Sequence, residues 1–128
     1  MNSLLQLTVI VLASLIPGVL WVRFFYLRDR YEREPISMLF RSFVVGALAV
    51  ALAAVVEMPF TDWVLPDAPL IAQLFAAFVV IGLGEELFKA LAVYLAAYRT
   101  QEFNEHADGI IYGAAVGIGF SVVENVLY

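Results

Sequence analysis

The sequence has no cysteine, which excludes disulfide bonds, a cysteine nucleophile and a thiolate zinc site within these 128 residues. It has one histidine, and charged residues make up only 15% of the chain, against about a quarter in soluble proteins. No run of basic residues points to nucleic acid. Apolar residues dominate instead, at 63%, with a mean hydropathy of +0.91. A 14.2 kDa soluble domain could not bury that much apolar surface, so the composition predicts a membrane protein.

Four apolar stretches are long enough to cross a bilayer, which takes roughly 20 residues each. They cover residues 4–26, 38–58, 70–98 and 109–128. We therefore expect an all-α, polytopic membrane helix bundle with four transmembrane helices, forming one domain over residues 1–128. Pro17 and Gly18 predict a kink in the first span. Because the sequence stops at the far edge of the fourth span, we interpret it as the N-terminal part of a longer protein.

The basic residues predict the orientation in the membrane. Five of the seven lie in or beside the first connection, in "RFFYLRDRYEREPISMLFR", and the second connection, "EMPFTDWVLPDAP", has none. The positive-inside rule then places the loops at 27–37 and 99–108 in the cytoplasm and the N-terminus outside. Aromatic residues favour the membrane interface, and several lie near span ends: Trp21, Tyr26, Trp63, Tyr98 and Tyr128.

Ionisable residues occur inside the third and fourth spans, where each costs about 2.5–3.5 kcal/mol on insertion scales. The third span contains "GEELFKA", in which Lys89 lies three residues after Glu86 and four after Glu85, so one helical face holds the cation beside either carboxylate. Glu85 lies roughly 20 Å along the helix from Tyr98, and Glu124 lies roughly 24 Å from the start of the fourth span. Because these spans are antiparallel neighbours, we expect Glu85, Glu86 and Glu124 to line one polar pocket near mid-membrane.

Glycines surround these charges. Gly82 and Gly84 are expected to loosen the third helix just before them. In the fourth span, one stripe carries small residues that predict close packing against the neighbouring helix, and it places Glu124 on that packing face; the stripe consists of Gly109, Gly113, Gly117, Phe120 and Glu124.

Two interpretations of the charged cluster stay open. A buried Glu–Lys pair can hold two helices together, or two carboxyl groups beside a cation can do general acid–base work. Glu85, Glu86 and Glu124 could also hold a metal ion. They make a poor zinc site, because zinc prefers His or Cys and no histidine lies in any span; His106 is expected to be a solvated loop residue.

Three motifs occur in this order: EExxK in "GEELFKA", then DGxxYG and FxxxEN in "DGIIYGAAVGIGFSVVENVLY". Together they narrow the choice between a structural and a catalytic role for the charged cluster. With "LRDRYEREP" after the first span, they resemble the PrsW family of intramembrane proteases, which is distantly similar to CAAX-processing membrane proteases. The resemblance covers roughly residues 17–128. It implies cleavage of a membrane-anchored substrate, such as an anti-sigma factor, in regulated proteolysis at the bacterial cytoplasmic membrane.

The resemblance also implies residue roles. Glu85 and Glu86 take the positions of the catalytic carboxylates, Lys89 the basic position, and Glu124 and Asn125 the FxxxEN positions. On chemical grounds Glu85 or Glu86 would deprotonate water, Lys89 would tune that carboxylate, and Asn125 would donate a hydrogen bond to substrate or oxyanion. The family has been described both as metalloproteases and as glutamic proteases, so the cofactor is open between zinc and none. The family also carries a histidine in a later span, so we expect these 128 residues alone to be inactive.

Two other functions are compatible with four spans and a membrane-embedded glutamate. One is a small proton-coupled multidrug transporter, although the strong arginine bias favours a single orientation. The other is a non-catalytic membrane scaffold or receptor, for which Glu86→Gln would leave function intact.

Overall fold

The computed structural model describes residues 3–28 and 33–127, and these residues form helices and no strands. Four helical rods are long and apolar enough to cross a membrane, as the sequence predicted. The first rod is α1 (Ser3–Arg28), and the second is α2 (Ile36–Glu57) with its extension η1 (Met58–Val64). The third rod consists of α3 (Leu70–Phe75), η2 (Ala76–Leu83), α4 (Gly84–Val93) and η3 (Tyr94–Tyr98). The fourth rod is α5 (His106–Leu127). The protein is therefore a multi-pass membrane protein with an up-and-down course.

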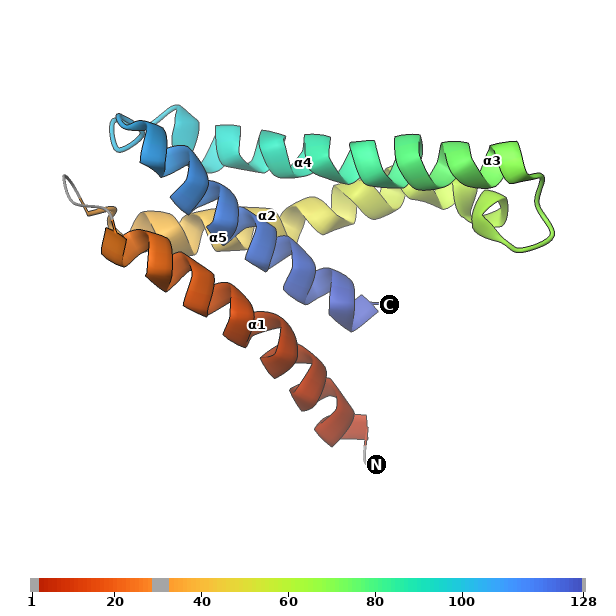
Figure 1. Ribbon diagram of the computed structural model, residues 1–128, viewed down its shortest axis with the longest axis horizontal. Coiled ribbons are helices and arrows are strands. Elements are labelled where there is room, and N and C mark those ends of the chain that lie inside the picture. Colours follow the sequence, from red (N-terminus) through yellow and green to blue (C-terminus); the bar gives the residue numbers. More distant parts are fainter. Residues whose placement is uncertain (1–2, 29–32, 128) are drawn as a thin grey trace.

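The connections lie at two opposite ends of the bundle (Figure 1). The last residues of α1, the first residues of α2 and the connection after η3 lie at one end, and the connection between η1 and α3 lies at the other. Part of the predicted cytoplasmic loop, at 29–32, lies outside the described residues. This arrangement agrees with the predicted pairing of the first and third loops on one side of the membrane.

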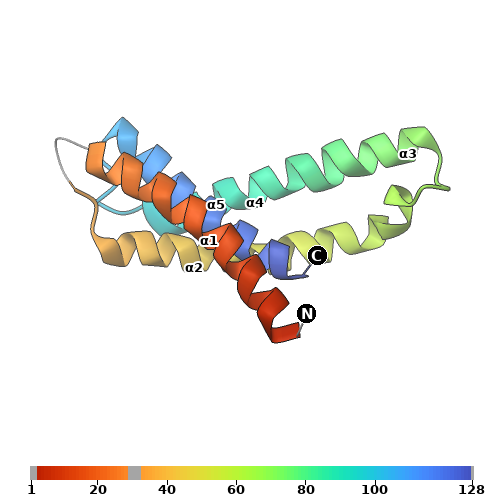
Figure 2. The same cartoon turned by 60° about the horizontal axis from the view of Figure 1, so that its bottom comes forward.

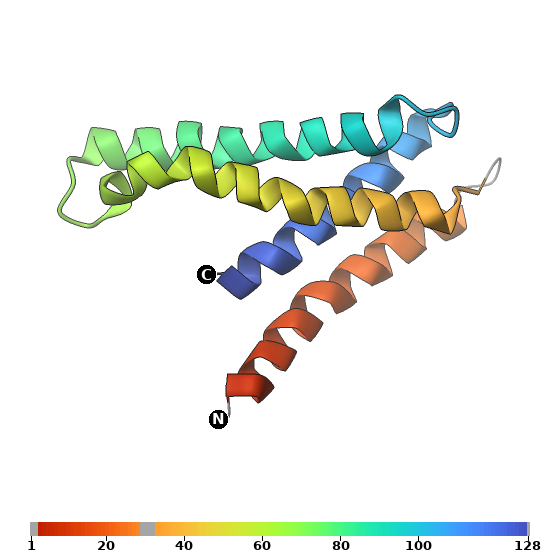
Figure 3. The ribbon, with the colours of Figure 1, turned by 180° about the vertical axis from the view of Figure 1, so that it is seen from behind.

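The rods pack around α5, which contacts α1, α2 and α4. The α2 helix and the α3–α4 rod lie side by side, and α5 crosses them, as Figures 1 and 3 show from opposite sides. Turning the molecule shows α1 lying across α5 (Figure 2). The α1 helix runs through Pro17 without a break, although a kink was expected there.

The core is small and is made mostly of short side chains. It lies between α2, α4 and α5 and consists of Ala49, Val50, Ala53, Ala92, Val116 and Phe120. Short side chains let helix backbones approach closely, which is how membrane helices associate without a hydrophobic driving force. Long apolar side chains instead point outward along the spans, for example Leu20, Leu48 and Phe78, and would face lipid.

Close packing in the fourth span uses glycines other than those predicted. A Cβ at Gly119 would overlap the backbone carbonyl of Phe43, and one at Gly46 would overlap that of Val116, so α5 packs most tightly on α2. At Gly113 and Gly117 a Cβ would meet nothing within 4 Å. The predicted stripe is therefore wrong as a packing face for these two glycines, because the tight contact lies on the adjacent side of the helix.

The structure describes some of the aromatic residues that were predicted to lie at the membrane interface. Trp21, Trp63 and Tyr98 are exposed near the ends of their rods, whereas Tyr128 lies outside the described residues.

Candidate active site

The charged side chains of the third span follow directly after wide helical turns. Residues 76–83 are π-helical, and the α-helical turns resume at Gly84, one residue before Glu85. Single stretches of π-helix inside α-helices are frequent at functional sites, because they rotate the following side chains relative to a regular helix. Gly82 lies in the π-helical stretch, so the predicted loosening of the helix just before the charges is confirmed.

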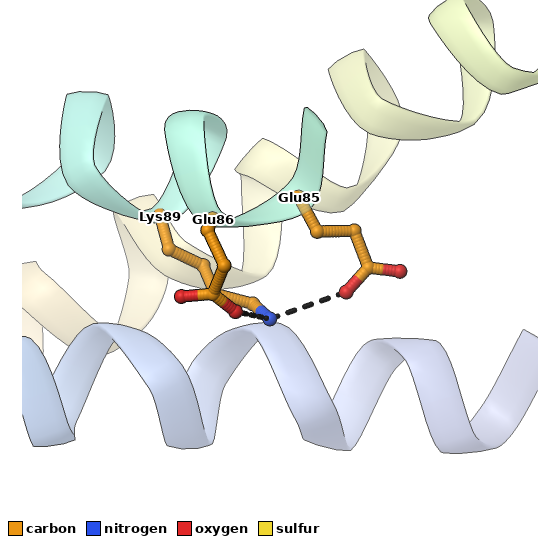
Figure 4. Close-up of polar contacts among 3 residues, drawn as sticks. All are labelled: Glu85, Glu86 and Lys89. Carbon is orange, nitrogen blue, oxygen red and sulfur yellow. Dashed lines mark hydrogen bonds and ion pairs between the residues drawn. The ribbon is translucent and has the colours of Figure 1, made fainter. Parts of the chain in front are cut away.

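Lys89 is held between both carboxylates rather than beside one of them. Its Nζ lies 3.2 Å from Glu85 Oε2 and 2.9 Å from Glu86 Oε1. The three side chains leave α4 on the side that faces α5 (Figure 4). The ammonium also lies 4.5 Å from the ring centroid of Phe120 on α5, a cation–π distance. The helical spacing in the sequence thus produces a compact ion cluster at the α4–α5 contact.

The two carboxylates differ in their surroundings. The side chain of Glu85 is 15% exposed and that of Glu86 is 71% exposed. Glu85 lies close enough to Glu124 of α5 to interact with it electrostatically. The two acids therefore lie near each other across the α4–α5 contact, while Glu86 faces open space.

A further acid belongs to this cluster and was missed in the sequence. Glu57, at the end of α2, lies close enough to Glu85 and Glu124 to interact with them electrostatically. One of its carboxylate oxygens is buried and has no hydrogen-bond partner. The only signal in the sequence was an acidic residue at the end of an apolar span.

A groove lies beside Glu86 and Lys89, between α4 and α5. It has a volume of about 450 Å³, and its walls are Glu86, Lys89, Ala90 and Val93 of α4 and Gly113, Gly117 and Ser121 of α5. The groove lies between the third and fourth spans, where a polar pocket was predicted, but of the three acids expected to line it only Glu86 does. The two glycines without a packing role also line it.

Asn125, by contrast, contacts α1. Its Nδ2 donates a hydrogen bond to Ser14 Oγ at 3.0 Å, and Ser14 Oγ donates in turn to the carbonyl of Ile10. In this arrangement Asn125 joins α5 to α1, and its role as an oxyanion donor stays a prediction.

The described residues offer few ligands for a metal ion. Within residues 3–28 and 33–127, no three His, Cys, Asp or Glu side chains are grouped as metal ligands. His106 is exposed at the start of α5, at the other end of that helix from Glu124. The residues present therefore do not form a metal site on their own.

A second polar network stabilises the N-terminal end of α5, next to the loop at 99–105. Asp108 Oδ2 accepts hydrogen bonds from the backbone N–H groups of Asn104 (2.8 Å) and Glu105 (2.6 Å), which caps the helix. The hydroxyl of Tyr112 donates to a carboxylate oxygen of Glu34, and both residues are buried. The Asp and Tyr of the DGxxYG motif thus fix the beginning of α5, and sequence reasoning did not find the partner Glu34.

Replacing Tyr112 with phenylalanine should destabilise the bundle by about 1–3 kcal/mol, because it removes a donor from a buried carboxylate. Thermal or denaturant unfolding in detergent would measure the loss. Tyr98→Phe, at an exposed tyrosine of η3, is the matched control and should have no effect. Equal stability of the two variants would show that the Tyr112–Glu34 bond contributes nothing.

Comparisons with known proteins found related sequences. Residues 34–128 match the family model described as PrsW family intramembrane metalloprotease. Proteins named "Protease PrsW" are 36% identical over 120 residues in Bacillus subtilis (strain 168), 40% over 117 in Geobacillus kaustophilus (strain HTA426) and 32% over 124 in Clostridioides difficile (strain 630). The matches cover 93%, 91% and 97% of this chain, and 53%, 50% and 50% of those proteins, so the chain spans about half their length. No solved structure matches.

Proposed function

Because the chain belongs to the PrsW family of intramembrane metalloproteases, we propose that it supplies the carboxylate site with which the protein cleaves membrane-anchored proteins. The observation that carries this proposal is the cluster in which Lys89 joins Glu85 and Glu86 while Glu85 meets Glu124. Charges inside a span are costly, and a purely structural ion pair would need only one carboxylate beside Lys89.

The groups of this chain can take part in water activation and proton transfer as follows. Glu86, open to the groove, takes a proton from water as the oxygen attacks the peptide carbonyl. Lys89, 2.9 Å from Glu86, holds that carboxylate in place and lies close to the negative charge that develops on the carbonyl oxygen. The proton that Glu86 takes from water passes to the leaving amine when the C–N bond breaks.

The family description implies a metal ion, which would polarise the carbonyl or the attacking water. Among the described residues, no three His, Cys, Asp or Glu side chains lie together as a metal site. None of the steps above therefore passes through a metal. Glu85, Glu86 and Glu124 would be the ligands that this chain offers to such an ion. Zinc and no metal remain the two alternatives to test.

For the substrate and location, we propose an anti-sigma-factor-like protein in the bacterial cytoplasmic membrane. The loops at 27–37 and 99–108 would face the cytoplasm, because the first of them is rich in arginine. The exposed apolar side chains of all four rods fit a bilayer environment.

The proposal is tested by purifying the full-length protein, reconstituting it in liposomes and adding single-span substrate proteins. Fragments are identified by mass spectrometry, with and without a zinc chelator. We expect cleavage in or next to the substrate span, and no cleavage of the same substrate without its span. A reconstituted, folded protein that leaves every membrane-anchored substrate intact would contradict the proposal.

A further inference from the structure

We propose that the groove between α4 and α5 receives an extended segment of the substrate polypeptide, and that Gly113 and Gly117 determine which substrate side chains fit. This inference rests on the proposed function and deepens it. The occupant is a segment of the membrane-anchored substrate, lying with its scissile peptide bond beside Glu86 and Lys89.

The two glycines have no packing role within the described structure. They lie one helical turn apart on α5, and a Cβ at either position would meet no atom within 4 Å. Gly46 and Gly119 are the opposite case, because a Cβ there would overlap backbone of the facing helix. Helix packing therefore accounts for Gly46 and Gly119 but leaves the glycines of the groove unexplained.

The groove has a polar part and an apolar part. Glu86, Lys89 and Ser121 provide charged and hydroxyl groups, and Ala90, Val93 and the two glycines provide small or apolar walls. A peptide backbone offers donors and acceptors to the first set, and its side chains can occupy the space over the glycines. A lipid tail has no polar group for Glu86, whose side chain is 71% exposed within a membrane span.

Size and position also favour a peptide segment. The volume of about 450 Å³ lies within the roughly 300–1,000 Å³ usual for ligand sites. The groove adjoins the carboxylate proposed to activate water, so a segment bound there has its backbone within reach of Glu86. Side chains at positions 113 and 117 would push that backbone away from the carboxylate.

The first experiment uses the full-length protein in liposomes and enlarges position 117 stepwise. Cleavage is expected to fall moderately in Gly117→Ala and by about a hundredfold in Gly117→Leu, because misplacing a substrate by about 1 Å costs that much. The unfolding midpoint should not fall, because alanine and leucine favour a helix more than glycine does. Ala51→Leu, which places the same side chain at an exposed position of α2, is the matched control and should cleave normally. Wild-type cleavage by a folded Gly117→Leu variant would overturn the proposal.

The second experiment measures binding without activity. The chain has no cysteine, so Gly113→Cys or Gly117→Cys provides one thiol in it. In a Glu86→Gln background, either thiol should form a disulfide with a cysteine placed near the scissile bond of a substrate, and Ile110→Cys, on an exposed face of α5, should not.

The two experiments separate the possible failures. Disulfides at 113 and 117 with no cleavage by the wild type would support the groove and contradict the proposed function. Cleavage by the wild type with no such disulfides would overturn the groove. Disulfides from 113 or 117 to another part of the same protein, in place of the substrate, would also overturn it, because the groove would then be filled internally.

Discussion

Glu86→Gln in the full-length protein is expected to lower the cleavage rate by about 10²–10⁴-fold, the usual contribution of a general base. An amide cannot accept the proton of the attacking water. The substitution should leave the fold intact, because the Glu86 side chain is 71% exposed and its loss removes only one of the two carboxylates on Lys89. Cleavage in liposomes and the unfolding midpoint in detergent measure the two effects separately.

The control for this variant is Asp67→Asn, which neutralises an exposed acid in the connection between η1 and α3. It changes the net charge by the same amount and should cleave at the wild-type rate. A Glu86→Gln protein as active as this control would remove Glu86 from the mechanism and would favour a purely structural ion cluster.

Gly119→Ala is expected to destabilise the bundle by about 1–3 kcal/mol, as overpacked cores do. The new methyl group would overlap the Phe43 carbonyl, which is backbone and cannot rotate away. Gly117→Ala, two residues earlier on the same helix, meets nothing within 4 Å and should not lower the unfolding free energy, which the higher helix propensity of alanine would raise by up to about 1 kcal/mol. Both are measured by denaturant unfolding in detergent. Equal stability of the two variants would contradict the close packing of α5 on α2.

The helices and their pairing followed from the sequence for simple reasons. Apolar length specifies a span, and short connections make consecutive spans antiparallel neighbours. The spacing of Glu85, Glu86 and Lys89 fixes their common face, since helical geometry alone brings residues three and four apart together. The meeting of Glu85 with Glu124 followed from their similar distances to the ends of neighbouring spans.

Contacts between distant segments could not be predicted in the same way. Glycines at four-residue spacing predict a flat helix face, but the spacing does not say whether a helix or a groove adjoins it. The tight face is centred on Gly119 because Gly46 of α2 faces the same contact, a match visible only in three dimensions. Glu57 and Glu34 were missed for the same reason, since their partners lie on α4 and α5.

The central claim is that Glu85 of α4 and Glu124 of α5 meet inside the membrane, and cysteine cross-linking tests it most directly. In full-length protein with no other cysteine, Glu85→Cys and Glu124→Cys are combined and treated in membranes with a short bifunctional thiol reagent. We predict an intramolecular cross-link in this pair. The control combines Glu124→Cys with Leu87→Cys, an exposed position two residues further along α4, and should not cross-link. Equal cross-linking of the two pairs, or none in the first, would contradict the account.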